Sequence, residues 1–267
     1  MRARGIRPKK RLGQHFLLDA KAARRVADLT VDAPGERVLE IGAGTGILTA
    51  ALLALGARLT AIEIDPGLAA HLRERFAGAV EANDLEVYEG DALAFDFDGY
   101  GRGEAWRVAG NLPYNVGTTL LVGLATRAEP PERIAAMLQK DVVDRLVAAP
   151  GSAAYGSISI LVAATMRVRR AFSLRPSAFH PRPNVDSSVV VLERRAVVPP
   201  GREWFTGIVK AAFAYRRKTL ANSLSRALGI PRERTVAALG TLSLDPEIRA
   251  ERLDLDAFTR LAAALAG

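Results

Sequence analysis

Cysteine is absent from the 267 residues of the sequence, and histidine occurs only three times. Without cysteine the chain can form no disulfide, bind no metal through thiolates and use no cysteine nucleophile. The sequence also lacks a run of about 18 apolar residues, and its basic N-terminus does not lead into an apolar segment of signal-peptide length. We therefore expect a soluble cytoplasmic protein with no membrane association and no metal site.

Acidic residues are in the minority, since 29 Asp and Glu oppose 37 Lys and Arg and leave a formal charge of +8. A positive excess favours a polyanionic partner, because basic side chains displace the counterions condensed on nucleic acid. Charge alone leaves three interpretations open: a nucleic-acid partner, an anionic membrane surface, and an arginine-rich protein with neither.

Short apolar runs alternate with helical stretches over the first half of the chain, which predicts an α/β fold with a mostly parallel sheet covered by helices on both faces. Two β-rich stretches then follow one another, at 166–172 and 187–193, and predict an antiparallel edge. The earlier strands are expected at 38–41, 59–62, 85–88, 106–109 and 134–138, and helices at 20–29, 48–55, 68–76 and 157–164.

The pattern is helical after the segment Val197-Val198-Pro199-Pro200-Gly201, which has the composition of a linker. Helices are expected at 204–214, 219–228, 234–239 and 257–265. We therefore predict two domains: residues 1–196, an α/β domain with a basic N-terminal arm, and residues 197–267, a small all-helical domain.

A glycine-rich turn, Gly42-Ala43-Gly44-Thr45-Gly46, joins the first predicted strand of the sheet to a helix. Glycines at such a turn allow a sharp backbone bend and a close ligand approach. Glu63, at the end of the next strand, lies 21 residues after Gly42, where a carboxylate can accept hydrogen bonds from both hydroxyls of a ribose. These positions indicate a nucleoside ligand, although such glycines can also form a turn without a ligand.

A dinucleotide site requires its third glycine at position 47, which is Ile47 here, so a nicotinamide oxidoreductase is disfavoured. The Gly42, Gly44 and Gly46 spacing instead resembles motif I of class I methyltransferases. That resemblance implies a Rossmann-like methyltransferase fold with S-adenosylmethionine as cofactor. The strand end Gly90-Asp91-Ala92 extends it, since Asp91 can accept a hydrogen bond from the cofactor's adenine amine, with Ala92 beside it.

The fourth predicted strand ends in Asn111-Leu112-Pro113-Tyr114, at the sheet edge where α/β proteins bind ligands. The lone pair of an adenine N6 amine is delocalised into the ring, so the amine becomes nucleophilic only when acceptors hold its two N–H groups. The side-chain oxygen of Asn111 and the carbonyl of Leu112, kept extended by Pro113, can be those acceptors. Tyr114 can stack on the base.

In isolation this tetrapeptide would be a polar turn after a strand. After a glycine loop, a ribose-type glutamate and a Gly-Asp, it resembles the [N/D]-[I/L/P]-P-[Y/F/W] signature of methyltransferases that act on nucleobase amino groups.

Three longer segments resemble the bacterial form of the small-subunit rRNA adenine dimethyltransferases: Lys10 to Asp19, Phe179 to Ser187 and Phe213 to Leu224. The resemblance implies that the side chain of His15, where many members carry Asn, and the backbone of Leu17 contact the cofactor, as does Asn111. It also implies that Phe179 faces the target base opposite Tyr114.

The resemblance implies dimethylation of two adjacent adenosines in the 3′-terminal hairpin loop of 16S rRNA, late in 30S assembly, by a monomeric enzyme. Two alternatives remain: the antibiotic-resistance branch, which modifies one adenine of large-subunit rRNA, and a non-catalytic RNA-binding factor on the same scaffold. We expect two basic clusters to contact the rRNA backbone: Lys9, Lys10 and Arg11, and Arg216, Arg217 and Lys218.

Overall fold

A computed structural model describes residues 12–196, 201–215 and 217–266 of the chain. The predicted RNA contacts Lys9, Lys10, Arg11 and Arg216 lie outside the described residues. Internal contacts divide the chain into two units, the first running to Val143 and including Val168–Arg194, and the second formed by Asp144–Arg167 and the chain from Arg195 onward.

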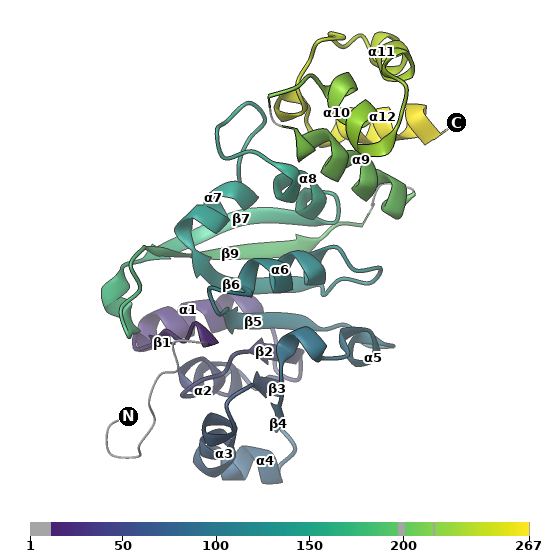
Figure 1. Cartoon of the computed structure of the whole chain (residues 1–267). Helices are drawn as coiled ribbons and strands as arrows, with labels where there is room; N and C mark the ends of the chain where they lie inside the picture. Colours follow the sequence, from purple (N-terminus) through teal and green to yellow (C-terminus); the bar gives the residue numbers. More distant parts are fainter. Residues whose placement is uncertain (1–11, 197–200, 216, 267) are drawn as a thin grey trace. The chain divides into compact units, whose positions relative to one another are not determined.

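The first unit is built on a seven-stranded sheet of the described residues with strand order β4-β3-β2-β5-β6-β9-β7. The strands β4, β3, β2, β5 and β6 are parallel to one another, and β9 is antiparallel to β6. This confirms the predicted parallel sheet with an antiparallel edge (Figure 1). The bounds are β2 Arg37–Ile41, β3 Arg58–Glu63, β4 Leu85–Glu89, β5 Arg107–Asn111, β6 Arg133–Gln139, β7 Met166–Leu174 and β9 Ser187–Arg194.

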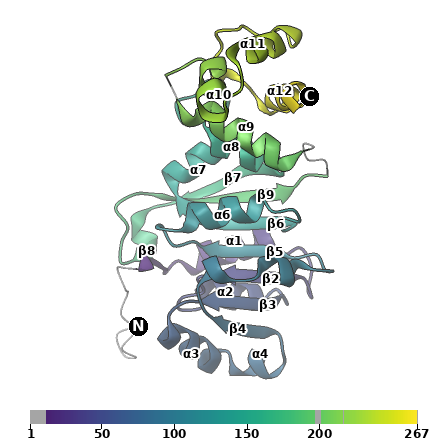
Figure 2. The same cartoon turned by 45° about the vertical axis from the view of Figure 1, so that its right-hand side comes forward.

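Helices cover both faces of this sheet, as Figures 1 and 2 show for α1 on one side and α6 on the other. Alternate strand residues are buried on opposite faces, so that Val38 packs with α1 and α2 while its neighbour Leu39 is equally buried. The helices of this unit are α1 Ala20–Thr30, α2 Ile47–Leu53, α3 Pro66–Arg75, α4 Ala77–Glu81, α5 Phe97–Gly101 and α6 Gly117–Ala125, with 3-10 turns η3 at Ala92–Ala94 and η4 at Pro176–Ala178.

A short strand near the N-terminus was not predicted. β1 (Phe16–Leu17) pairs antiparallel with β8 (Phe179–His180), and the backbone N–H of Leu18 also donates to the carbonyl of Ala178 at 2.8 Å. Two residues are too few to show a period in the sequence. The pairing nevertheless ties the chain ahead of α1 to a segment more than 160 residues later, and both segments belong to the functional site described below.

The second unit has a hydrophobic core of its own, made by α8 (Ser157–Ala163) and the C-terminal helices. The hydroxyl of Tyr155 donates to the carbonyl of Leu253 at 2.8 Å within this unit. Residues 144–167, which the sequence analysis placed with the α/β domain, thus pack with the helical region. The remaining bounds are α7 Lys140–Leu146, α9 Arg202–Ala214, α10 Leu220–Leu228, α11 Arg232–Thr241, η5 Ala250–Arg252 and α12 Leu255–Ala266.

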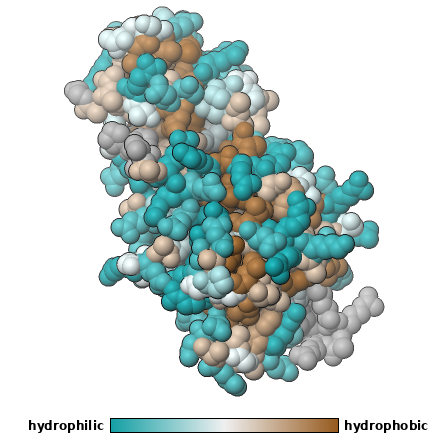
Figure 3. All heavy atoms as spheres, turned by 180° about the vertical axis from the view of Figure 1, so that it is seen from behind, coloured by the Kyte–Doolittle hydropathy of each residue, from teal (hydrophilic) through white to brown (hydrophobic). Residues whose placement is uncertain are grey.

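Hydrophilic residues cover much of the molecular face seen in Figure 3, with smaller apolar areas between them. Within the described residues, no helix is both long and apolar enough to cross a membrane.

Candidate functional site

The glycine turn lies at the carboxyl end of β2 and is held by the carboxylate of Glu63. Gly42 and Gly44 adopt positive φ angles of 73° and 58°, which side chains disfavour. The backbone N–H of Gly44 donates to Glu63 Oε2 at 2.8 Å, and that of Asp65 donates to Oε1 at 2.9 Å. Burial raises the pKa of Glu63, and these two backbone donors oppose the rise. Each oxygen keeps a lone pair for a further donor.

Gly46 serves packing rather than the cavity. It has a φ of 79° and forms the N-cap of α2. A Cβ on Gly46 would lie 2.6 Å from Phe76 Cε2 and 2.9 Å from Leu72 Cδ2. Gly46 was predicted to belong to the cofactor site. In the structure it packs against residues behind the turn, whereas Gly42 and Gly44 line cavities directly.

The larger cavity, of about 180 Å³, opens at the carboxyl ends of β2, β3 and β4. Asp91 and Ala92 line it as the sequence predicted, and Asp91 Oδ1 also accepts the N–H of Leu93 at 2.9 Å. Most of its other lining side chains are apolar: Leu12, Ile41, Ile62, Ile64, Pro113, Val116 and Leu120. This lining suits a flat aromatic base with an edge contact to Asp91.

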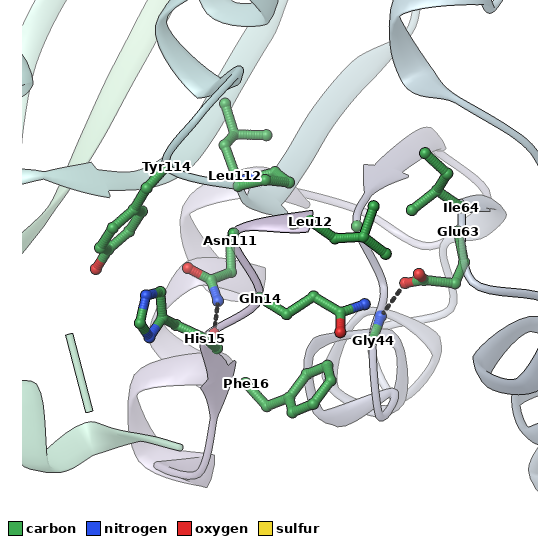
Figure 4. A pocket seen from close by; sticks show the side chains of 13 residues that line it. Leu12, Gln14, His15, Phe16, Gly44, Glu63, Ile64, Asn111, Leu112 and Tyr114 are labelled. Carbon is green, nitrogen blue, oxygen red and sulfur yellow. Dashed lines mark hydrogen bonds between the residues drawn. The ribbon is translucent and has the colours of Figure 1, made fainter. Parts of the chain in front are cut away.

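A smaller cavity of about 60 Å³ adjoins it and brings together residues from three distant segments (Figure 4). His15 comes from the N-terminal segment, Gly44 and Glu63 from the nucleotide turn, and Asn111 and Tyr114 from the end of β5. Leu12 lines both cavities. Leu17 lines a third space of about 20 Å³ beside Glu40 and Asn111.

Asn111 is oriented by one hydrogen bond and offers an unused acceptor. Its Nδ2 donates to the backbone carbonyl of His15 at 2.7 Å (Figure 4). Its Oδ1 is buried and has no hydrogen-bond partner among the described residues. The carbonyl of Leu112 likewise accepts no hydrogen bond within that part of the chain. Since buried polar atoms are normally paired, two vacant acceptors side by side indicate a site for a ligand with two N–H donors.

Tyr114 is fixed from two directions. Its hydroxyl shares a hydrogen bond of 2.5 Å with the hydroxyl of Ser187 at the start of β9. Its ring lies 4.9 Å from the ring of His15, and His15 Nδ1 is 2.7 Å from the carbonyl oxygen of Pro181. Burial raises the pKa of Tyr114, so the phenol is the relevant form at neutral pH. The ring is thus held at one angle over the cavity.

Phe179, predicted to face the target base, is 1% exposed and belongs to the hydrophobic core of the first unit. It does not line the three cavities described above. Its role opposite Tyr114 stays a prediction.

Glu40 is a buried carboxyl that no sequence motif marks. It accepts a hydrogen bond from the hydroxyl of Thr49 at 2.6 Å. Burial raises its pKa to about 7, the Thr49 hydrogen bond opposes this, and the nearby Glu63 adds to it.

The sequence assigned no role to Leu12, Ile64, Leu120 and Ser187. Leu12 and Ser187 lie within the segments Lys10 to Asp19 and Phe179 to Ser187, and Ile64 directly follows Glu63 at a strand end. Leu120 reaches the site through helix packing, which leaves no local signal. Within the described residues there is no group of three or more His, Asp or Glu side chains that could hold a metal ion.

The chain is similar to known proteins over nearly its whole length. The family model described as ribosomal RNA adenine dimethylase matches residues 5–266. A ribosomal RNA small subunit methyltransferase A from Geobacter metallireducens is 41% identical over 99% of this chain and 98% of its own length. Its counterpart from Pseudomonas aeruginosa is 43% identical over 97% and 95% of the two chains. The family resemblance predicted from the sequence is therefore confirmed.

Two solved structures resemble the chain as a whole. A dimethyladenosine transferase from Plasmodium falciparum has a TM-score of 0.79 at 25% identity and covers 92% of this chain and 96% of its own. The 23S rRNA methyltransferase ErmE has a TM-score of 0.73 at 26% identity, with 94% and 100% covered. These likenesses confirm the predicted class I methyltransferase fold with its helical appendage.

Proposed function

The chain belongs to the ribosomal RNA adenine dimethylase family, and from this premise we propose its reaction and its substrate. It transfers methyl groups from S-adenosylmethionine to the N6 amines of two adjacent adenosines in the 3′-terminal hairpin loop of 16S rRNA, in the assembling 30S subunit. It acts in the cytoplasm as a monomer. Residues 1–196 supply the methyltransferase site and residues 197–267 help to hold the rRNA.

The residues present fit the cofactor. Asp91, beside Ala92, would accept a hydrogen bond from the amine of its adenine in the larger cavity. Glu63, which lines the smaller cavity, would accept hydrogen bonds from its ribose hydroxyls. Gly42 and Gly44 would allow its close approach, and His15 and Leu17 would contact it from the N-terminal segment, while Gly46 keeps the turn packed. When bound, the cofactor supplies a methyl group on a sulfonium. Catalysis then depends on how the protein presents the amine.

The mechanism depends on the two acceptors that have no hydrogen-bond partner within the described residues. Asn111 Oδ1 and the Leu112 carbonyl accept the two N–H groups of the target amine, which localises its lone pair on nitrogen. The carbonyl of His15 fixes the amide of Asn111 so that the oxygen and not the nitrogen faces the amine. Tyr114 stacks on the base, with Phe179 predicted on its other side. No general base is needed, because the methylated nitrogen becomes acidic and releases a proton to water.

We choose small-subunit rRNA because of one observation. Relatives named small subunit methyltransferase A are 41–43% identical to the chain over nearly its full length. The likeness to ErmE supports a second candidate, one adenine of 23S rRNA. Arg217 and Lys218 are available to bind the rRNA backbone in either case, since both are exposed and neither forms an ion pair within the described residues.

The deciding experiment offers the enzyme labelled cofactor with two substrates, 30S particles lacking the modification and 23S rRNA similarly prepared. We expect label in two adjacent adenosines of 16S rRNA, identified by nuclease mapping. Label confined to 23S rRNA would move the protein to the second candidate. Transfer to neither substrate, with cofactor bound, would support the non-catalytic factor.

A further inference from the structure

Many arginines on and around the sheet of the first unit are neutralised by carboxylates. Arg107 bonds to Asp32 at 2.9 Å and to Glu36 at 2.7 Å, and Arg133 bonds to Asp32 at 2.7 Å. Similar ion pairs hold Arg37, Arg58, Arg73, Arg127 and Arg194.

Three exposed arginines on β7 and the segment after it form no such ion pair, and we call them the basic edge: Arg169, Arg175 and Arg182. Their guanidinium groups make no ion pair, hydrogen bond or ring contact with any described residue. They lie on β7 and on the segment that follows it. From Met166 to Val185 this stretch contains no Asp or Glu at all.

The two outer strands of the sheet therefore differ in charge. β7 is one edge and β4 the other. β4 and the turn before it carry exposed Asp84, Glu86 and Glu89 and no basic residue. A polyanion would be repelled from the β4 edge and attracted to the β7 edge.

Hydrogen bonds connect the basic edge to the candidate site. Ser187, which holds the Tyr114 hydroxyl, is followed by Ser188, whose hydroxyl is 2.9 Å from that of Ser173 at the end of β7. Arg175 is two residues beyond Ser173. On the other side, Arg182 follows Pro181, whose carbonyl oxygen is 2.7 Å from His15 Nδ1. Arg175 and Arg182 therefore each lie within two residues of a residue that is hydrogen-bonded toward the site, Ser173 on one side and Pro181 on the other.

The dimensions suit a nucleic-acid backbone. Arg175 lies six positions after Arg169, which in extended chain corresponds to about 20 Å. That length matches several successive phosphates of an RNA strand. A further cation lies nearby, since the guanidinium of Arg25 on α1 stacks 3.6 Å above the ring of Phe172 on β7.

We propose that Arg169, Arg175 and Arg182 bind the phosphate backbone of the rRNA next to the target adenosine, so that the β7 edge guides the strand to Tyr114. The inference rests on the proposed function for the identity of the RNA. It adds an RNA-binding surface on the methyltransferase unit itself, made of other residues than the basic clusters predicted at 9–11 and 216–218.

The test compares Arg169→Gln/Arg175→Gln/Arg182→Gln with a control of equal charge, Arg58→Gln/Arg73→Gln/Arg102→Gln. The control residues are exposed and lie near the β4 edge or on the α5 side. Binding to 30S particles lacking the modification is measured at several salt concentrations with S-adenosylhomocysteine present. Each lost phosphate contact should lower the slope of log affinity against log salt by roughly 0.7–0.9.

We expect the basic-edge variant to bind at least roughly tenfold more weakly at about 0.1 M salt, with a slope smaller by about 2, and the control to change far less. Cofactor affinity and thermal unfolding should match wild type, because the three guanidinium groups form no ion pair, hydrogen bond or ring contact within the described residues. Single variants of Arg175 and Arg182 repeat the measurement if the triple variant folds poorly.

Equal affinities and slopes for all proteins would overturn the inference. Unchanged RNA binding with new self-association of the triple variant would also overturn it and would assign the arginines to protection of an edge strand. Wild-type protein methylates the same particles in parallel. If wild type binds and methylates while the variant binds equally well, only the inference fails; if wild type does neither, the proposed function fails.

Discussion

The side-chain nitrogen of Asn111 donates to the backbone carbonyl of His15 at 2.7 Å, across 96 residues of chain. This bond decides which end of the amide faces the cavity. An asparagine amide is nearly symmetric in shape, and a rotation by half a turn would present donors to an amine that needs acceptors. The N-terminal segment therefore positions a group that the fourth predicted strand supplies.

Replacing Asn111 with Ala should slow methyl transfer about 100-fold or more, because an acceptor that acts in the transition state is lost. Cofactor affinity should stay within a few-fold. Asn111→Asp, of equal size, loses the donor to His15 and sets a carboxylate against a carbonyl, so it should not restore activity. Single-turnover rates with saturating 30S particles, together with calorimetric cofactor affinity, check both. Unchanged turnover of the alanine variant would remove Asn111 from the mechanism.

Ser187→Ala should lower kcat by about two- to tenfold, the worth of one neutral hydrogen bond, with little change in cofactor affinity. Tyr114→Phe removes the same bond from the other side and keeps the ring. The double variant should then be no worse than the poorer single variant. Fully additive losses would show that the two hydroxyls act separately.

Gly46→Ala should destabilise the fold by about 1–3 kcal/mol, because φ is 79° and the new Cβ would meet Phe76. Urea unfolding measures this. The folded variant should retain cofactor affinity within a few-fold, in contrast to changes at Gly44. Gly78→Ala on α4 is the matched control, since nothing lies within 4 Å of its Cβ position. A stable Gly46 variant with weak cofactor binding would contradict the packing role.

Glu40 should make stability depend on pH. Burial raises its pKa to about 7 from an ordinary 4.5, so between these values the folded chain keeps a proton that the unfolded chain has lost. Stability therefore falls as pH rises through that window. Glu40→Gln removes this fall, which amounts to about 3 kcal/mol. Urea unfolding near pH 5 and near pH 8 tests it, with exposed Glu81→Gln as control; parallel pH profiles for Glu40→Gln and wild type would exclude the effect.

The sequence predicted the elements of the sheet, and it singled out Gly42, Gly44, Glu63 and Asp91, which line the two adjoining cavities, because they follow strands whose apolar runs are local signals. It also singled out Asn111, because the tetrapeptide that begins with it follows a glycine loop, a ribose-type glutamate and a Gly-Asp at the ends of earlier strands. It did not predict the partners of those residues. These partners are the carbonyl of His15, the hydroxyl of Ser187 and the strand pair β1–β8, and their positions depend on strand order. The sequence around Phe179 does not distinguish a core ring from a ring that contacts a base.

The long-range contacts of the site also set an order in which a growing polypeptide can become functional. A nascent chain that has reached β6 already contains the glycine turn, Glu63 and Asn111. It lacks β8, which anchors β1 beside His15, and Ser187, which holds Tyr114. Nucleotide-binding competence is thus encoded well before catalytic competence, and a translation product that stops short of Ser187 contains a cofactor pocket without a tethered tyrosine.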